Sequence, residues 1–90
     1  MSDCIFCKII NKEIPSTAVY EDDKVYAFKD INPVAPVHVL IVPKQHISNI
    51  NEINESNSSY LISIHMAAQK IAAELGIKDS GFRLINNCGP

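Results

Sequence analysis

Cysteine and histidine are the residues of this 90-residue sequence whose types and spacing point most directly to chemistry. Cys4 and Cys7 form a C-x-x-C pair, and two thiolates at this spacing on one turn can bind the same Zn²⁺ ion. The spacing also occurs in redox-active thiol pairs, which usually begin a helix that follows a β-strand. No strand is expected before Cys4. Zinc binding, redox activity and two small buried thiols all stay open as interpretations.

The three histidines occupy different settings. His46 follows an apolar run and can be a third zinc ligand in a loop, or else a polar residue at a helix start. His38 lies among apolar residues, where an imidazole usually bonds a backbone carbonyl but can also orient a catalytic group. His65 falls within a long expected helix and is interpreted as a surface or interface side chain. Cys4, Cys7 and His46 would be one ligand short of a closed tetrahedral site.

A carboxylate and several apolar residues suggest a second kind of site. Asp30 can accept hydrogen bonds from a ribose, or it can form the turn that leads into Asn32 and Pro33. Four apolar residues can line a flat slot for a planar base or form part of a hydrophobic core: Phe6, Ile9, Phe28 and Ile31. The sequence has no P-loop, G-x-G-x-x-G or G-x-S-x-G pattern.

Several short elements must position these residues. A helix or helical turn is expected over residues 4–11, with Asp3 as its N-cap. A hairpin is expected next, with strands Thr17–Glu21 and Val25–Asp30. It is followed by a central strand Val37–Val42, which is covered on both sides and ended by Pro43. A long helix Tyr60–Leu75 is expected to be capped by Ser58 or Ser59 and followed by Gly76 as C′ residue, and Phe82–Asn87 is expected to form a last strand.

The long helix carries an unusually wide apolar arc. Two arrangements explain it, either a sheet on one side with a second subunit on the other, or complete burial of the helix within one subunit. The length of 90 residues indicates one domain over residues 1–90, and a hydrophobic content of 47% is typical of a globular protein.

Charge and hydropathy exclude some classes of function. The formal net charge of −2 gives no basic surface, so nucleic-acid binding is not expected. Neither a signal peptide nor an apolar run long enough for a membrane span is apparent, so we expect a cytoplasmic protein with reduced cysteines and no membrane partner.

Seven ordered segments strongly resemble the Hint-like branch of the histidine-triad (HIT) family. They begin at Cys4 (CIFCKII), Glu13 (EIPS), Tyr20 (YEDD), Ala27 (AFKDINP), Ala35 (APVH), Val42 (VPKQHI) and Gly81 (GFRLINNCG). The resemblance implies an α+β fold with an antiparallel meander sheet, one short N-terminal helix and one long helix. It also implies a homodimer joined through the long helix and an adjacent strand.

The resemblance further implies a function and residue roles. Purine nucleotides would bind, and nucleoside phosphoramidates or related α-phosphate substrates would be hydrolysed through a nucleotidyl-histidine intermediate. His38 would support the catalytic cluster, and the zinc ligands would be Cys4, Cys7 and His46. By position, the nucleotide-binding residues would be Ile5, Phe6, Ile9, Phe28, Asp30, which accepts from the ribose, Ile31 and Asn87.

One departure from the family pattern is large. Relatives continue past Gly89 with a phosphate-binding loop and a strand carrying H-x-H-x-H, whose middle histidine is the nucleophile and whose first histidine is the fourth zinc ligand. None of these is present in the 90 residues. We therefore expect a C-terminally incomplete domain that lacks its last strand or strands, and we expect this chain to be inactive. The alternative function is a non-catalytic, dimeric, zinc-stabilised nucleotide-binding or interaction module.

Overall fold

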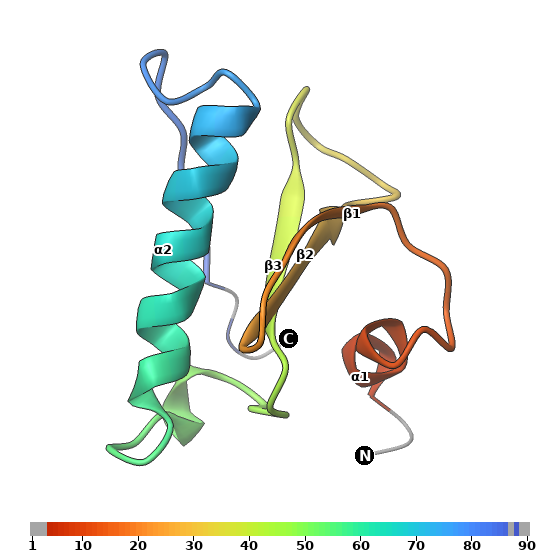
Figure 1. Cartoon of the computed structure of the whole chain (residues 1–90), viewed down its shortest axis with the longest axis vertical. Coiled ribbons are helices and arrows are strands. Elements are labelled where there is room, and N and C mark those ends of the chain that lie inside the picture. The colour runs from red at the N-terminus through yellow and green to blue at the C-terminus, as the bar shows by residue number, and fades with distance from the viewer. Residues whose placement is uncertain (1–3, 87, 89–90) are drawn as a thin grey trace.

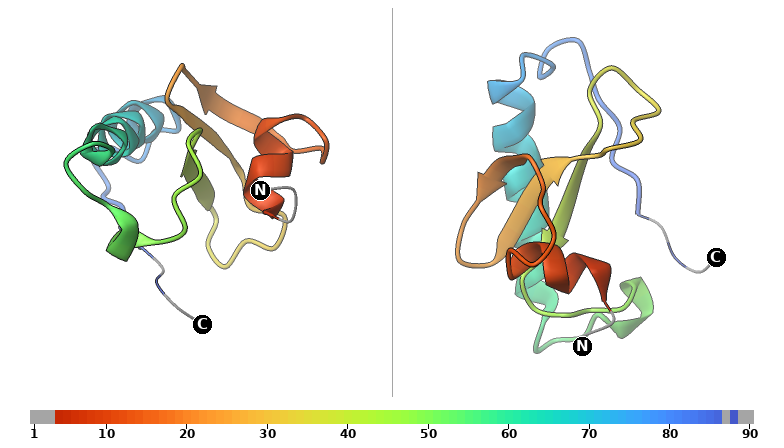
Figure 2. Two further views of the ribbon diagram at one scale, coloured as in Figure 1. Left: turned by 90° about the horizontal axis from the view of Figure 1, so that it is seen from below. Right: turned by 90° about the vertical axis from the view of Figure 1, so that its right-hand side faces the viewer.

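A three-stranded sheet lies between two helices in the computed structural model, which describes residues 4–86 and 88 (Figure 1). The elements are α1 (Ile5–Ile10), β1 (Ala18–Glu21), β2 (Val25–Lys29), β3 (Val39–Pro43), the 3₁₀-helix η1 (Ile50–Glu52) and α2 (Ser58–Glu74). The strands are antiparallel and follow chain order, β1-β2-β3. The expected α+β fold with a meander sheet and one short and one long helix is confirmed. Figure 2 shows α1 and α2 on opposite sides of the sheet.

Burial in β2 alternates between the two faces of the sheet, because successive side chains of a strand point to opposite sides. Val25 and Ala27 form one buried cluster with Ala67 and Ile71 of α2. Tyr26 and Phe28 form a second cluster with Ile9 of α1. One five-residue strand therefore holds a helix against each face of the sheet.

Asp22 fixes the turn between β1 and β2. Its Oδ1 accepts hydrogen bonds from the backbone N–H groups of Lys24 (2.8 Å) and Val25 (2.9 Å). Its Oδ2 accepts from the Tyr20 hydroxyl at 2.9 Å. The turn fixes the register that pairs β1 with β2, with Glu21 opposite Tyr26. On its other side β2 pairs with β3, from Val25 opposite Pro43 to Lys29 opposite Val39.

The prediction that residues 37–42 form the central strand is wrong for the described part of the sheet. β2 is the central strand there, and β3 lies at the edge with half-buried residues. The strand begins at Val39, so His38 immediately precedes it rather than lying within it. The apolar pattern of 37–42 gave the correct two-sided contacts, but it could not show which strand has two neighbours.

The predicted helix starts also need correction. Cys4, not Asp3, is the N-cap of α1, because the Cys4 sulfur accepts a hydrogen bond from the Cys7 N–H. α2 begins at Ser58 after Asn57, two residues earlier than predicted, and neither predicted serine is its cap. The C-terminal prediction is confirmed. Gly76 has a φ of +75°, in the left-handed region. The Ile77 N–H donates to the Ala72 carbonyl, which is the hydrogen bond of a Schellman C-cap.

The predicted last strand, Phe82–Asn87, is wrong over residues 82–86, which form no regular structure, and Asn87 lies outside the described residues. Phe82, Leu84 and Ile85 are exposed. A strand needs a neighbour to pair with, and no sheet pairing of this segment occurs among the described residues. Among the residues that the structure describes, no helix is long and apolar enough to cross a bilayer.

Candidate functional site

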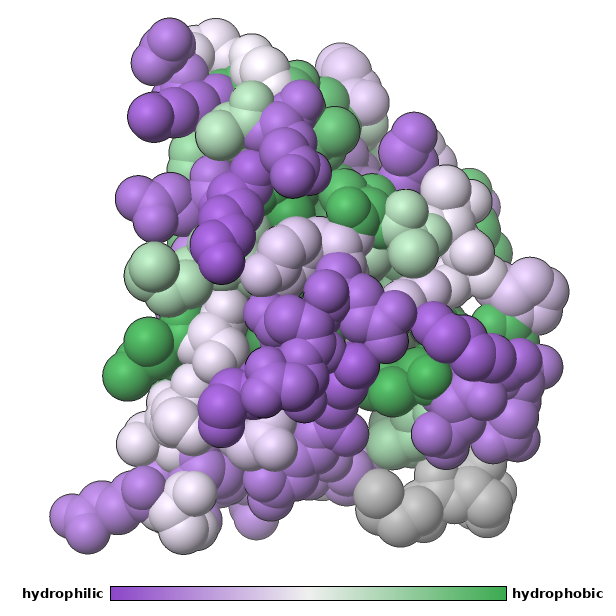
Figure 3. All heavy atoms as spheres, viewed as in Figure 1, coloured by the Kyte–Doolittle hydropathy of each residue, from purple (hydrophilic) through white to green (hydrophobic). Residues whose placement is uncertain are grey.

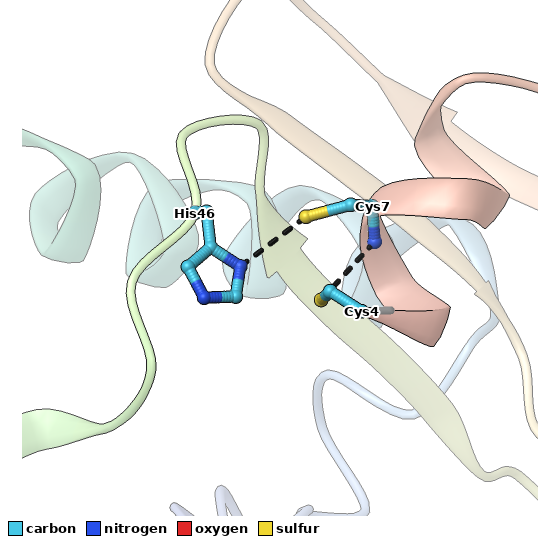
Figure 4. A group of neighbouring side chains, drawn as sticks. All are labelled: Cys4, Cys7 and His46. Carbon is cyan, nitrogen blue, oxygen red and sulfur yellow. Dashed lines mark hydrogen bonds between the residues drawn. The ribbon is translucent and has the colours of Figure 1, made fainter. Parts of the chain in front are cut away.

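Three potential metal ligands from distant parts of the chain meet beside α1 (Figure 4). The sulfur atoms of Cys4 and Cys7 and a ring nitrogen of His46 all lie within 4.8 Å of one another. The Cys7 Sγ is 3.2 Å from the His46 Nδ1. The two cysteines come from the first turn of α1, and His46 comes from the loop that follows β3.

Local structure brings these ligands together. Cys4 lies at the helix start, and its sulfur accepts the Cys7 N–H at 3.4 Å, so both thiols project from one end of α1. The loop carrying His46 leaves β3 beside the β1–β2 turn, where the Lys44 N–H donates to the Lys24 carbonyl at 2.7 Å. The Lys44 Nζ also lies 2.9 Å from the Glu21 Oε2. The loop therefore departs in a fixed direction, toward α1.

The two thiols have opposite pKa shifts. Burial raises the pKa of Cys4, but hydrogen bonds, above all from the backbone N–H of Cys7, outweigh it and leave that pKa below its usual value. Hydrogen bonding to Cys4, then burial, raise the pKa of Cys7. Cys4 therefore loses its proton more readily than Cys7, and a bound cation would favour the thiolate form of both.

The donor set fits zinc better than hard cations. Thiolate sulfur and imidazole nitrogen suit Zn²⁺, whereas Mg²⁺ and Ca²⁺ prefer oxygen ligands. The far nitrogen of His46, Nε2, lies 3.5 Å from the Ser48 hydroxyl, which can orient the ring. Ser48 was not among the sequence candidates. A hydroxyl two residues after a candidate ligand is the only signal that could have indicated it.

A largely apolar cavity of about 240 Å³ adjoins Cys4, Cys7 and His46, the candidate metal cluster. Cys4, Cys7 and His46 line it together with residues of β3, of the segment that follows β3 and of α2, such as Ile41, Ile50 and Ile64. Among the predicted nucleotide-binding residues that the structure describes, only Phe6 also lines this cavity. The cavity therefore belongs to the metal cluster and not to the expected base slot.

Phe28 packs against two other candidates for base binding, Phe6 and Ile9 of α1, on the α1 side of the sheet. The rings of Phe6 and Phe28 are tilted at 44° with centroids 6.4 Å apart. Phe6 and Ile5 remain 42% and 56% exposed, and Ile31, in the loop after β2, is 88% exposed. Ile9 is buried against Tyr26 and Phe28.

Asp30 and His38 form a contact that closes the loop between β2 and β3. The His38 Nε2 lies 3.4 Å from the Asp30 Oδ2, and the Asp30 N–H donates to the His38 carbonyl at 3.1 Å. The His38 Nδ1 accepts the Val34 N–H at 3.1 Å. A neutral His38 must therefore carry its proton on Nε2, facing the carboxylate. The Val34 contact comes from the backbone and has no sequence signal.

The fold thus brings together two sets of residues that the sequence singled out. Cys4, Cys7 and His46 are adjacent, as are Asp30 and His38. His65 lies elsewhere, exposed on α2, with its Nδ1 2.8 Å from the Leu61 carbonyl oxygen. The roles of all these residues stay predictions, and so does the role of Asn87, which lies outside the described residues.

Comparison with known proteins gives a consistent picture. The family model described as "Scavenger mRNA decapping enzyme C-term binding" matches residues 3–90. The chain is 46% identical over 85 residues to the purine nucleoside phosphoramidase of Escherichia coli K12, covering 94% of this chain and 71% of that protein. It is 47% identical over 90 residues to a 14 kDa zinc-binding protein of Brassica juncea, covering 98% and 79%. A solved structure of a HIT family hydrolase from Clostridium thermocellum superposes with a TM-score of 0.96 at 63% identity, covering 99% of this chain and 77% of that one.

Proposed function

The chain belongs to the histidine-triad (HIT) family, and we propose that it binds purine nucleotides as a member of that family's hydrolases. The proposed family reaction is the hydrolysis of nucleoside phosphoramidates or related α-phosphate substrates. Its support comes from the similarity to a purine nucleoside phosphoramidase and from the residues on the α1 side of the sheet.

The observation that carries the proposal is a carboxylate at the end of β2 together with the partly exposed ring of Phe6, which lies against the buried Phe28. Phe28 and Asp30 are two residues apart at the end of β2, and Phe6 lies against Phe28. Phe6, Ile5 and Ile31 expose apolar surface that a purine ring can cover. The Asp30 carboxylate can then accept hydrogen bonds from the ribose hydroxyls, and its Oδ1 is already positioned by the Asn32 N–H at 2.9 Å.

We assign no nucleophile within these 90 residues. The reaction proposed for the family needs the middle histidine of an H-x-H-x-H pattern, and His38, His46 and His65 do not form one. His38 is assigned a supporting role, which its contact with Asp30 is consistent with. A polypeptide of only these residues is therefore expected to bind nucleotide without turning it over.

Zinc is the metal that we propose for the cluster of Cys4, Cys7 and His46. The similarity to a zinc-binding protein and the soft donor set support this assignment. The ion would link the start of α1 to the loop after β3 and so act as a structural crosslink.

A homodimer through α2 is also proposed. Ile62 and Met66 are 65% and 50% exposed on this helix, although its other side is buried against the sheet. Figure 3 shows hydrophobic side chains reaching the surface along α2. The same exposed surface favours the second candidate function, a dimeric nucleotide-binding or interaction module without catalysis.

Titration with adenosine monophosphate (AMP) tests the proposed function. Asp30→Asn is expected to weaken AMP binding about tenfold to hundredfold, because a hydrogen bond to a charged acceptor is lost. Adenine, which lacks the ribose, should bind the variant and the parent equally. Asp79→Asn, at an exposed position after α2, is the matched control and should change neither affinity. Absence of AMP binding by the parent chain, or equal AMP affinities for the parent and Asp30→Asn, would contradict the proposal.

A further inference from the structure

We infer that Cys4 and Cys7 are a reversible oxidation site, and that a disulfide between them and a zinc ion in the cluster exclude each other. The zinc half of this inference rests on the proposed function, whereas the disulfide half does not. The partners are a peroxide as oxidant and a thiol as reductant.

The geometry of α1 favours a disulfide within one turn. Cys4 is the N-cap, with extended backbone at φ −80° and ψ 116°, and Cys7 is the third residue of the helix. The Cys7 N–H already points at the Cys4 Sγ, and the two sulfurs lie within 4.8 Å of each other. Side-chain rotation can bring them to the disulfide bond length of about 2.05 Å.

Access to the thiols is open. Cys4 and Cys7 are both partly exposed free thiols, and both line the cavity of about 240 Å³ beside β3. Hydrogen peroxide is small enough to enter such a space. The third cysteine, Cys88, contacts the Asn51 Nδ2 at 3.6 Å and is exposed, so it can be replaced without disturbing the pair.

The oxidation balances with hydrogen peroxide alone. The Cys4 thiolate attacks one peroxide oxygen, forming a sulfenic acid and releasing hydroxide. The Cys7 sulfur then attacks the Cys4 sulfur, the S–S bond forms, and the sulfenic oxygen leaves as a second hydroxide. Because Cys4 enters the reaction as a thiolate, the two hydroxides become water by taking the Cys7 proton and one proton from solvent. A dithiol reverses the change by thiol–disulfide exchange and is itself oxidised.

Mutual exclusion follows from the sulfur electrons. A metal needs both sulfurs as thiolates, and in the disulfide each sulfur is bonded to the other. His46 would then be the last of the three clustered ligands, and a single imidazole holds zinc weakly. α1 should stay in place after oxidation, because Ile9 remains buried against Tyr26 and Phe28. The change is therefore confined to the start of α1 and the loop around His46.

The test uses the full chain in a Cys88→Ser background, metal-free and zinc-loaded. After hydrogen peroxide, non-reducing peptide mapping of the metal-free protein should show Cys4 linked to Cys7 within one chain. Dithiothreitol should restore both thiols. The zinc-loaded protein should form the same bond more slowly. It should release zinc in proportion to the disulfide formed, and a colorimetric chelator measures the released zinc. The oxidised protein should take up no zinc until it is reduced.

Two variants separate the parts of the inference. Cys7→Ser should give a Cys4 sulfenic acid that dimedone traps, and no disulfide. His46→Asn keeps both thiols and should still form the disulfide. Sulfinic acid as the main product, disulfides only between chains, or zinc retained on the oxidised protein would overturn the inference. If the reduced chain binds no zinc, both the mutual exclusion of zinc and disulfide and the proposed metal site are overturned. If the reduced chain binds zinc but peroxide forms no disulfide, this inference is overturned and the proposed function still stands.

Discussion

At the metal cluster, one imidazole connects two parts of the chain that are 39 residues apart. His46 is exposed, and its Nδ1 reaches Cys7 at 3.2 Å while Nε2 faces the Ser48 hydroxyl at 3.5 Å. Its proposed contribution is therefore ligation of a metal and not packing in the core. Replacing it should change metal affinity strongly and the metal-free fold only slightly.

His46→Asn is expected to weaken zinc binding by at least about tenfold to hundredfold, the loss usual even for residues that only orient a ligand. Competition with a chromogenic chelator measures this affinity. His65→Asn is the matched control, because His65 is exposed on α2 and away from the cluster. Equal zinc affinities for the two variants would show that His46 is not a ligand.

Asp22 gives the protein a defined sensitivity to acid. Hydrogen bonds from the backbone N–H of Lys24, and also from Val25 and Tyr20, hold the pKa of its carboxyl below the usual range despite the opposing effect of burial. A lowered folded-state pKa means that this stabilisation is present above the unfolded carboxyl pKa and is lost as pH falls through the folded one. Stability should therefore decrease in that acidic window.

Asp22→Asn tests this linkage through urea denaturation at several pH values. The variant should be less stable than the parent by about 1 kcal/mol near neutral pH, and the difference should shrink as Asp22 of the parent becomes protonated. Asp23→Asn, at the neighbouring exposed position, should show no such pH-dependent difference. A gap between Asp22→Asn and parent that stays constant down to strongly acidic pH would contradict the assignment.

Among the elements, β2 has the greatest structural influence because it contributes to both hydrophobic clusters. Val25 and Ala27 are fully buried toward α2, and Tyr26 and Phe28 are nearly so toward α1. Since Phe28 also contacts Phe6, the strand supports the proposed base slot while it holds α2 on the other face. Loss of contact on the α2 side should destabilise the whole sheet.

Ile71→Ala removes buried methylene groups where α2 meets β2. Ile71 is 4% exposed, so the variant should lose about 2–4 kcal/mol of unfolding free energy. Ile85→Ala, where the side chain is 71% exposed, should change stability by less than about 0.5 kcal/mol. Thermal or urea unfolding compares them, and similar losses in both variants would argue against the cluster as the source of stability.

The sequence predicted the type of most helices and strands correctly, but it predicted less well which elements lie next to one another. The hairpin and the Gly76 helix end depend on local residues, and both were predicted correctly. The N-cap of α2 was mispredicted because the Asn57 side chain turns back to the preceding loop, accepting the Asn54 N–H and donating to the Glu52 carbonyl. Strand formation at 82–86 depends on a partner strand, which local residue types cannot reveal.

The candidate sites depended on two different kinds of information. The C-x-x-C pair is visible from spacing alone, but the approach of His46 to Cys7 depends on the departure of the chain from β3. The contact between Asp30 and His38 likewise needs the loop that joins β2 and β3 to close. Single-residue roles were therefore suggested by the family resemblance, and the structure supplied the contacts.

For the molecule as a whole, the exposed apolar side of α2 is the surface proposed to bind a second copy of the chain. Ile62→Glu and Met66→Glu, made singly, are expected to shift a homodimer toward monomer, because each places a charge in an apolar interface. Sedimentation velocity measures the shift. Ser80→Glu adds the same charge at an exposed position outside α2 and should leave the association unchanged. A parent chain that is monomeric at all concentrations would remove the basis for a dimer.

The central proposal is that a nucleotide binds between α1 and the end of β2. A crystal structure of the chain with AMP tests it most directly. We predict the adenine ring against Phe6, Phe28 and Ile31, with the ribose hydroxyls within hydrogen-bond distance of the Asp30 carboxylate. AMP in the cavity beside Cys4 and Cys7, or a nucleotide that leaves the Asp30 carboxylate without a ribose contact, would contradict the claim.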